Sequence, residues 1–379
     1  MTTTKNNEHK KLKVPNIRFP EFQGEWEKCA LENLSTEIGD GIHATPLYDD
    51  NGTYYFVNGN NISEYGITIT PTTQRVTEAE AYRNNANILC SKTILLSING
   101  TIGNVALYKG EPIMLGKSAC YINVSTKVNK HYIFHYLMMP KCQFYFTSEL
   151  TGTTIKNLSL KSVRRTKVSL PNLKEQNRIA QLFDAINERI VTQNKIIDKL
   201  KSLIKGISKQ LLMNNQNWRT VRIGELLRIG NGKDYKHLGI GKIPVYGTGG
   251  QMLLVNDYLY DGESVCIGRK GTIDTPMFLK GKFWTVDTLF YTYDFKDVLP
   301  KFCYYLFLQI NWKLYNEGTG VPSLSKSTIE NIKVKIPSIE QQHNICSVLD
   351  CYEHKTKSEE QILELYLSEK QYLLRQMFI

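Results

Sequence analysis

The residues of this chain best suited to chemistry are hydrogen-bonding side chains in loops rich in glycine and asparagine. The loops cover residues 40–55, 57–61, 231–237, 246–250 and 268–272. Asn and Gln side chains pair with adenine edges and Arg and Lys with guanine, and each good bidentate contact contributes about 1–3 kcal/mol of discrimination. Small glycines also let backbone N–H groups approach phosphates. The loops therefore indicate contact with nucleic acid, with ordinary surface turns as the alternative for individual residues.

A basic segment at residues 156–167 is a second candidate for contact with DNA. No acidic residue interrupts the stretch from Thr151 to Pro171, although a solvated basic face would explain the segment equally well. The segment, the loops and neighbouring polar positions supply the candidate DNA-contacting residues. They are His43, Thr45, Asn58, Asn60, Asn61, Asn99, Lys117, Lys156, Arg164, Arg165, Lys233, Tyr235, Lys236, Tyr246, Thr248, Arg269, Lys270 and Lys326.

No arrangement of catalytic residues is recognisable. The chain lacks the N-P-P-[YF] or D-P-P-Y run of an amino-methyltransferase and a G-x-G loop after a strand. The GKS at 116–118 departs from a phosphate-binding P-loop because Gly110 lies one residue too far upstream. The histidines stand near no Ser or Cys nucleophile signature, and no carboxylate cluster has metal-ligand spacing. We therefore expect no catalysis, metal or cofactor in this chain itself.

Composition sets broader bounds. The 379 residues suggest two or three domains, and 47 Lys and Arg against 36 Asp and Glu give a formal charge of +11, which weakly favours a polyanionic partner. The eight cysteines are scattered without a C-x-x-C pair, as expected for free thiols in a reducing compartment. The polar N-terminal stretch and the lack of a long apolar run predict neither a signal peptide nor a membrane anchor. We expect a cytoplasmic protein with no membrane partner.

An internal repeat organises the chain. Residues 151–184 return as residues 317–350 at a constant offset of 166, with 10 of 34 positions identical. Upstream, Trp26 matches Trp218, but the stretches between are looser and differ in length. Self-similarity of this kind defines the architecture before any local prediction. It indicates a constant frame that carries two variable heads.

Each head reads as mixed α/β. Runs rich in Val, Ile, Tyr and Phe between Gly, Asn and Asp turns predict strands at 54–57, 93–98, 105–108, 245–246, 264–267 and 289–293. Stretches rich in Tyr, Phe and Leu predict a helix at 132–146 in the first head and at 299–315 in the second. We expect both helices to pack on the sheets.

Each repeat continues into a helix with apolar residues spaced alternately by four and three, which is the pattern of a coiled coil. The spacer residues are Ile179, Phe183, Ile186, Ile190, Ile197, Leu200, Ile204, Ile207 and Leu211 in the first helix, and Ile345, Leu349, Tyr352, Leu363, Tyr366 and Leu373 in the second. Gln193 interrupts the first seam, and Thr356, Glu359 and Lys370 interrupt the second, which leaves open whether part of it faces a partner.

About 40 residues make each helix about 60 Å long. Neither seam can be buried alone, and a parallel pairing would need a long return connection, so we expect the two helices to pack antiparallel with the heads at opposite ends. Homodimerisation is the alternative. The prediction is an α+β fold of two mixed α/β heads, joined and separated by two long antiparallel coiled-coil helices, with a pseudo-two-fold internal repeat. The predicted domains are 1–170, 171–214 (helix), 215–336 and 337–379 (helix).

These features resemble the specificity subunit of a type I restriction–modification enzyme. The resemblance rests on LPNLKEQNRIAQLFD and IPSIEQQHNICSVLD opening the helices, on the GTxxxxLS exits, and on the head motifs DGIHATPLY and IGRKGT with FWTVDT. It covers residues 14–379 and implies that each head is a target-recognition domain that reads one half of a bipartite DNA sequence. The helices would form a spacer that sets the gap between the two halves.

The resemblance also implies partners. Two modification subunits would methylate adenine from S-adenosylmethionine, and restriction subunits would add ATP- and Mg²⁺-dependent translocation and cleavage of the double-stranded DNA. This chain would supply recognition only. A self-contained DNA methyltransferase or nuclease, and a coiled-coil scaffold that does not bind DNA, are the alternatives. The target sequence does not follow from the residues, because recognition loops are read by geometry.

Overall fold

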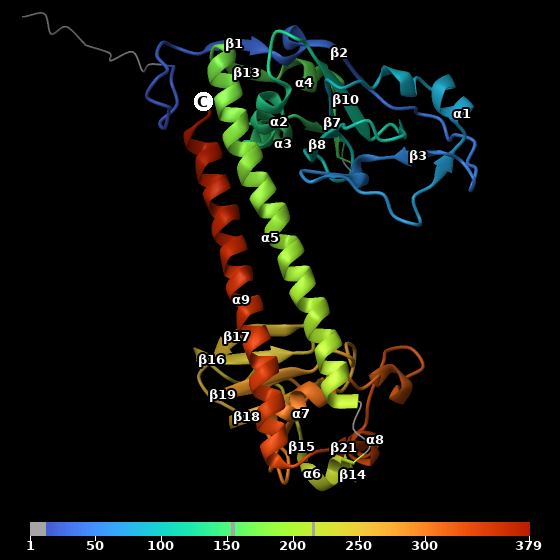
Figure 1. Ribbon diagram of the computed structural model, residues 1–379, viewed down its shortest axis with the longest axis vertical. Coiled ribbons are helices and arrows are strands. Elements are labelled where there is room, and N and C mark those ends of the chain that lie inside the picture. Colours follow the sequence, from blue (N-terminus) through green and yellow to red (C-terminus); the bar gives the residue numbers. More distant parts are fainter. Residues whose placement is uncertain (1–12, 153–155, 214–216) are drawn as a thin grey trace, which may run out of the picture. The chain divides into compact units, whose positions relative to one another are not determined.

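The computed structural model describes residues 13–152, 156–213 and 217–379, which form two compact units (Figure 1). Unit 1 combines the residues up to Lys195 with Gln361–Ile379, and unit 2 is Ile196–Glu360. Two long helices, α5 (Leu173–Met213) and α9 (Ile339–Gln376), each contribute to both units. Each unit therefore consists of a head and one half of each helix.

The head of unit 1 is built on a four-stranded sheet of order β2-β10-β7-β8 and a second sheet of order β6-β3-β9, in which β3 and β9 are parallel. Three two-stranded pairs, β1-β13, β4-β5 and β11-β12, complete it. The strands are β1 (Glu27–Ala30), β2 (Ser35–Asp40), β3 (Tyr54–Val57), β4 (Ile62–Ser63), β5 (Gly66–Ile67), β6 (Arg75–Val76), β7 (Thr93–Ser97), β8 (Val105–Leu107), β9 (Ile113–Leu115), β10 (Ala119–Val124), β11 (Leu150–Thr151), β12 (Asn157–Leu158) and β13 (Lys167–Leu170). The helices are α1 (Glu78–Arg83), α2 (Lys130–Met138), α3 (Pro140–Ser148) and α4 (Leu160–Arg165), and the 3-10 turns are η1 (Leu31–Leu34), η2 (Gly59–Asn61) and η3 (Ala86–Ile88).

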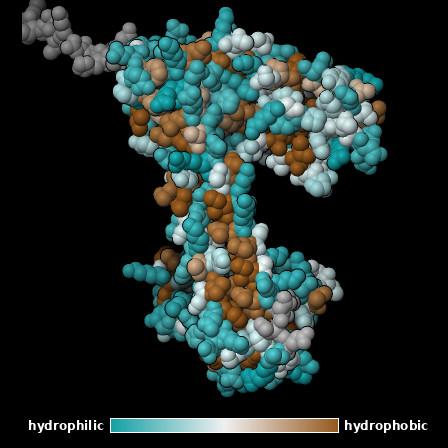
Figure 2. All heavy atoms as spheres, viewed as in Figure 1, coloured by the Kyte–Doolittle hydropathy of each residue, from teal (hydrophilic) through white to brown (hydrophobic). Residues whose placement is uncertain are grey.

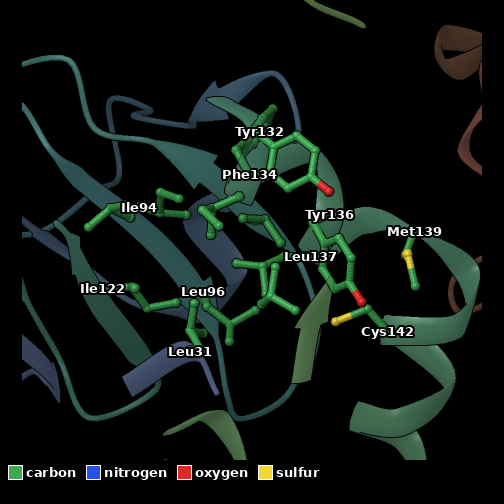
Figure 3. Close-up of a cluster of buried hydrophobic side chains, with 14 of the residues drawn as sticks. Leu31, Ile94, Leu96, Ile122, Tyr132, Phe134, Tyr136, Leu137, Met139 and Cys142 are labelled. Atoms are coloured by element: carbon green, nitrogen blue, oxygen red, sulfur yellow. The ribbon is translucent and has the colours of Figure 1, made fainter. Parts of the chain in front are cut away.

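The central strands β7 and β10 are buried along their whole length because both faces of the sheet are covered. Successive side chains of a strand point to opposite faces. Ile94 and Leu96 pack with Tyr132 of α2 on one face (Figure 3), whereas Leu95 belongs to a cluster with Val57 of the second sheet. The head is therefore layered, with α2 placed between the main sheet and the long helices.

The head of unit 2 has a single six-stranded sheet of order β15-β20-β18-β19-β16-β17 and a separate pair, β14-β21. The strands are β14 (Arg219–Arg222), β15 (Arg228–Asn231), β16 (Ile240–Gly247), β17 (Gly250–Val255), β18 (Tyr260–Gly268), β19 (Met277–Thr285), β20 (Leu289–Tyr293) and β21 (Lys333–Ile336). The helices are α6 (Ile223–Leu226), α7 (Pro300–Phe307) and α8 (Lys326–Asn331), with a 3-10 turn η4 (Trp312–Tyr315).

The two predicted head helices are each interrupted. The predicted helix at 132–146 is divided into α2 and α3, because Pro140 opens α3 and the preceding Met139 is extended. Proline disfavours helical geometry in the residue before it and cannot donate to the preceding turn. The predicted helix at 299–315 ends at Phe307, whose carbonyl accepts a hydrogen bond from the buried Trp312 indole at 2.9 Å. The predicted strands lie within, or within one residue of, observed strands.

The long helices bury the predicted apolar seams in both units. In unit 1, Ile179, Phe183, Ile186 and Ile190 share a core with the end of α9, and the Phe183 and Phe378 rings lie 5.5 Å apart. Leu363, Tyr366 and Leu373 line the same core. Since the start of α5 meets the end of α9, the helices run antiparallel in this unit, as predicted.

Unit 2 repeats the arrangement with the other helix halves. Ile207 and Leu211 pack with Ile345 and Leu349, and farther from the head Lys201 pairs with Glu360 at 2.8 Å. The remaining predicted seam residues are Ile197, which is buried, and Leu200, Ile204 and Tyr352, which are half-buried. The prediction of an α+β fold with two mixed α/β heads, two antiparallel coiled-coil helices and an internal repeat is confirmed.

A buried glutamine joins each long helix to its head. In unit 1, Gln176 accepts a hydrogen bond from the Asn129 amide at 3.0 Å and donates one to the Pro171 carbonyl at 2.8 Å. Its repeat partner in unit 2, Gln342, accepts from the Leu299 amide at 2.8 Å and donates to the Pro337 carbonyl at 3.1 Å. Asn129 and Leu299 are the residues that precede α2 and α7. The amide of the repeat motif thus fastens the head helix and the long helix together in both units.

An aspartate two turns further along each long helix forms a second link. Asp184 contacts His131 Nδ1 at 2.7 Å and His135 Nε2 at 2.8 Å, both on α2. Asp350 accepts a hydrogen bond from the Tyr305 hydroxyl at 2.6 Å, and Lys301 lies 3.4 Å from it. The repeat therefore retains the acid, while its partners on the head helix differ.

Removing the glutamine amide should destabilise the unit that contains it. Gln176→Ala leaves the Asn129 N–H and the Pro171 carbonyl without their partner in a buried site, so we expect a loss of about 1–3 kcal/mol in the free energy of unfolding. Urea denaturation monitored by circular dichroism measures it. Gln181→Ala, at an exposed position of α5, is the matched control. Equal stability of the two variants would contradict the role of the amide.

Acidification should destabilise unit 1 through His135. Burial lowers the pKa of His135, and the hydrogen bond and charge of Asp184 only partly oppose this. The unfolded chain therefore takes up a proton near the ordinary histidine pKa of about 6.5, while the folded unit takes it up only at lower pH. The free energy of unfolding should fall as pH drops below that value, by no more than about 1.4 kcal/mol per pH unit for this one group. Denaturation of wild type and His135→Gln across this range measures it.

His135→Gln should show a shallower pH dependence than wild type over the same range. Burial raises the pKa of Asp184, but the hydrogen bonds and charges of His131 and His135 have a larger effect, so the pKa is lowered overall. The contribution of Asp184 to the free energy of unfolding is therefore lost only as pH falls through that lowered pKa. Tyr305→Phe is the control, because the equivalent link in unit 2 contains no histidine. Equal slopes for wild type and His135→Gln would contradict the assignment.

Candidate nucleic-acid interface

In unit 1, loops that are distant in sequence meet at one end of the head. Gly59 donates to the Ser118 hydroxyl at 2.8 Å, and the Thr101 hydroxyl donates to the Gly59 carbonyl at 3.0 Å. A backbone bridge joins Asn99 to Asn157, and another joins Ile42 to Gly116. We call the loops 41–45, 58–61, 98–103 and 116–118, together with 156–157, loop cluster 1.

Unit 2 assembles its loops through equivalent contacts. A backbone bridge joins Lys270 to Ser323, which is the repeat partner of Asn157. The Arg269 amide donates to the Thr288 carbonyl at 2.8 Å, as the Ile98 amide does to the Ser118 carbonyl at 3.0 Å in unit 1. We call the loops 231–237, 246–250, 268–272 and 286–288, together with 322–326, loop cluster 2.

Most of the predicted contact residues lie in these clusters. Cluster 1 contains His43, Thr45, Asn58, Asn60, Asn61, Asn99, Lys117 and Lys156, and cluster 2 contains Lys233, Tyr235, Lys236, Tyr246, Thr248, Arg269, Lys270 and Lys326. Backbone parallel pairing of β3 with β9 and of β16 with β19 brings two loops of each cluster to the same sheet edge. The structure therefore collects residues that the sequence places up to 113 positions apart, from His43 to Lys156 in cluster 1.

Side chains within the clusters fall into two groups. Asn58 accepts from the Ser118 hydroxyl at 2.9 Å, and Asn61 accepts from the Asn58 amide and donates to the Thr68 carbonyl. Tyr235 packs partly buried against Trp284 and Val245. These residues shape the loops.

The exposed side chains are the ones placed to reach a ligand. They are His43, Thr45, Asn60, Lys117 and Lys156 in cluster 1, and Lys233, Lys236, Arg269 and Lys270 in cluster 2. Arg269 stacks over the Phe290 ring at 5.9 Å, and His43 pairs with Asp40 at 2.9 Å. Cationic and amide groups on exposed loops suit phosphate oxygens and base edges.

The basic segment has a separate position. Arg164 and Arg165 lie in the last turn of α4, and Arg164 donates to the Ile38 carbonyl at 2.7 Å. Arg165 lines a surface hollow with Lys141 and Lys167. At the offset of 166, unit 2 has Glu330 and Asn331 in place of the two arginines. The basic face on α4 is thus particular to unit 1.

Sequence reasoning did not identify the side chain that supports loop 98–103. Gln143 on α3 donates to the Gly103 carbonyl at 2.9 Å and to the Leu137 carbonyl at 2.7 Å. The loop approaches this amide closely, because a Cβ at Gly103 would lie 2.3 Å from Gln143 Oε1. A glutamine in a helix gives no local signal of such a role.

In the part of the chain that the structure describes, no group of three or more His, Cys, Asp and Glu side chains could hold a metal ion. Among the same residues, no helix is both long and apolar enough to span a bilayer.

Comparisons with known proteins agree with this architecture. A family model described as the type I restriction modification DNA specificity domain matches twice, at residues 23–202 and 215–365. A sequence assigned as the type I restriction enzyme MjaX specificity subunit of Methanocaldococcus jannaschii is 24% identical, over 93% of this chain and 94% of its own. The MjaVIII specificity subunit of the same organism is 23% identical, over 66% of this chain and 72% of its own.

Solved structures share the fold. The S subunit of a type I restriction–modification system from M. genitalium matches with a TM-score of 0.64 and 17% identity, over 97% of this chain and 99% of that one. A chain from a structure of type I R–M complex assembly and conformational transition matches with a TM-score of 0.55 and 15% identity, over 92% of this chain and 96% of that one.

Proposed function

The chain belongs to the family of type I restriction–modification DNA specificity domains and is a DNA-binding specificity subunit, and we propose that loop clusters 1 and 2 are the surfaces that touch the two half-sites. The observation that carries the proposal is that loop clusters 1 and 2 have equivalent backbone bridges but differ in the side chains at equivalent positions. The Asn99–Asn157 and Lys270–Ser323 bridges occupy equivalent places, yet one cluster has the exposed Asn60 and Lys117 where the other has the half-buried Thr248 and the exposed Asp287. A constant frame with variable donors is what reading two different short sequences requires.

We infer that this chain recognises DNA and leaves the chemistry to its partners. Under this proposal two modification subunits bind S-adenosylmethionine and methylate adenine, and restriction subunits use ATP and Mg²⁺ on the double-stranded DNA. The adenine would be flipped out of the duplex into a modification subunit. Since the chain acts on DNA, we place it in the cytoplasm. A self-contained DNA enzyme and a scaffold that does not bind DNA receive no support from the comparisons.

Exposed apolar side chains on the long helices offer a place for the partner subunits. Figure 2 shows apolar surface along these helices. Exposed apolar side chains of the helices include Ile196 and Leu203 in unit 2 and Ile362 and Leu365 in unit 1. Leu365 is the most exposed of them at 68%, and apolar side chains that gather in one patch mark interaction surfaces. We propose that modification subunits cover these positions.

The first test is the DNA methylation that depends on this chain. In a host that lacks other such systems, the modification subunit is expressed with and without the chain, and methylated adenines are mapped by long-read sequencing. We expect a split motif with a fixed gap that appears only when the chain is present. Absence of new methylation, despite a purified complex of the two subunits, would count against the proposal.

Lysines of the two clusters should affect different halves of that motif. Lys117→Ala in cluster 1 and Lys270→Ala in cluster 2 each remove an exposed ammonium group, so each should weaken binding by about 1–3 kcal/mol and relax discrimination at one half-site only. The measurement is binding of the chain–modification complex to duplexes that carry single changes in either half. Lys335→Ala, on strand β21 outside cluster 2, is the control. If both variants relaxed the same half-site, the assignment of one cluster to each half would be wrong.

A further inference from the structure

Lys370 lies in the apolar seam of α9, yet it is 1% exposed. Its ammonium group contacts Glu64 Oε2 at 2.5 Å, and the Glu64 side chain is 33% exposed. Burying a lysine without a counter-charge is costly, so the position of Lys370 depends on the arrival of Glu64. At Lys370, one of the three polar positions of the second seam, the side chain is therefore directed at this chain's own head, where the sequence had left open whether the seam faced a partner.

Glu64 belongs to a segment that continues directly from loop cluster 1. It lies in the turn between β4 and β5, three residues after Asn61. The Thr68 amide donates to the Asn61 carbonyl at 2.7 Å, and the Asn61 side chain donates to the Thr68 carbonyl at 3.0 Å. Asn104 also holds the Ile62 carbonyl at 3.0 Å. Loop 58–61 and the β4–β5 hairpin are thus one hydrogen-bonded piece, with Asn60 exposed at one end and Glu64 at the other.

The opposite end of this piece faces the long helices of unit 1. Glu64 and Tyr65 line a cavity of about 380 Å³ with His131 and Asp184 and with Glu188 and Lys195 of α5. The hairpin is consequently the part of the head that closes against α5 and α9 beside the Asp184 link. Ser118 and Thr101 hold loop 58–61 at one end of this piece, and the Lys370–Glu64 pair holds the other end. Supporting contacts at both ends restrict the orientation of the loop more than contacts at one end do.

We propose that the Lys370–Glu64 ion pair is a positioning contact that fixes loop 58–61 for recognition of the first half-site. The proposal rests on the proposed function, since it assigns a role in DNA reading to residues that do not touch DNA. A buried ion pair contributes little net stability compared with apolar packing, but it is directional. Its principal effect is therefore on where the loop sits.

Among the residues that the structure describes in unit 2, the repeat position shows no counterpart of the pair. The helix position equivalent to Lys370 is Ile204, which shares a cavity with Phe278 and Tyr304. Lys301 of α7 and Glu353 of α9, which pair at 2.8 Å, also line this cavity, so the head and the long helices of unit 2 are linked by different groups. Loss of the Lys370–Glu64 pair should accordingly affect one half-site and leave the other unchanged.

The test uses the full chain in complex with its modification subunit. Lys370→Met keeps the length and packing of the side chain but removes the charge, and Glu64→Gln removes the partner. For each variant, adenine methylation rates are measured on duplexes with single changes in either half-site, and the first half-site is defined as the one that Lys117→Ala affects. We expect each variant to lose about five- to tenfold of its discrimination at the first half-site and none at the second.

Two further variants separate positioning from folding. The exchanged pair Lys370→Glu with Glu64→Lys should restore most of the discrimination, and Lys174→Met, at an exposed position of α5 in unit 1, should leave it unchanged. The melting temperature of Lys370→Met should stay within about 3 °C of wild type. Unchanged discrimination at the first half-site, or an equal loss at both half-sites that follows the melting temperature, would overturn the inference. Either result with wild-type methylation intact would leave the proposed function standing, whereas absence of split-motif methylation by the wild type would remove the proposed function itself.

Discussion

A buried primary amide at the start of each long helix is the constraint on which the rest of the fold depends. The side-chain oxygen of Gln176 and of Gln342 accepts a hydrogen bond from the backbone N–H of the residue before the head helix. The side-chain nitrogen of each donates to the carbonyl of the proline that precedes the long helix. These bonds tie the start of each long helix to its head, and the apolar seam packs the two helices together. Because hydrogen bonds in a buried site have strict geometry, the same glutamine gives the same junction in both units.

The two units share this junction but differ in the contacts around it and in their sheets. Asp184 contacts two histidines, whereas Asp350 contacts a tyrosine and a lysine. The aspartate of the second link is thus the same in both units, while the residues that it binds on the head helix differ. The sheets also differ, since β3 and β9 form a separate sheet in unit 1 while β16 and β19 belong to the single sheet of unit 2. The loop clusters nevertheless form through equivalent backbone bridges, so the side chains that they display can vary without disturbing the support beneath them.

The sequence was sufficient to predict the features that rest on a repeating pattern. It did not predict contacts that occur at a single position in the fold. The heptad spacing from Ile179 to Leu211 and the repeat around Gln176 and Gln342 were sufficient to predict two long helices and two equivalent heads. The break at Pro140 was visible in the sequence, but the stretch rich in Tyr and Phe around it favoured one continuous helix. No local signal shows that Asn58 and Asn61 bond within their own loop, that Gln143 supports Gly103, or that Lys370 finds Glu64 more than 300 positions away. Such contacts are decided by tertiary geometry, which composition and periodicity do not encode.

The end of α9 completes the core of unit 1, and this has a consequence for the order in which the protein matures. Phe378 packs on Tyr132, Tyr136 and Phe183, and the Gln376 carbonyl accepts from the Ile17 amide at 3.0 Å. Unit 1 therefore joins segments from opposite ends of the sequence, whereas unit 2 is a continuous stretch. During synthesis, which proceeds from the N-terminus, unit 2 has all of its residues before unit 1 does. The head that is translated first is therefore the one that finishes folding last, and until then the end of α9 does not cover the apolar face of Ile179, Phe183 and Ile186.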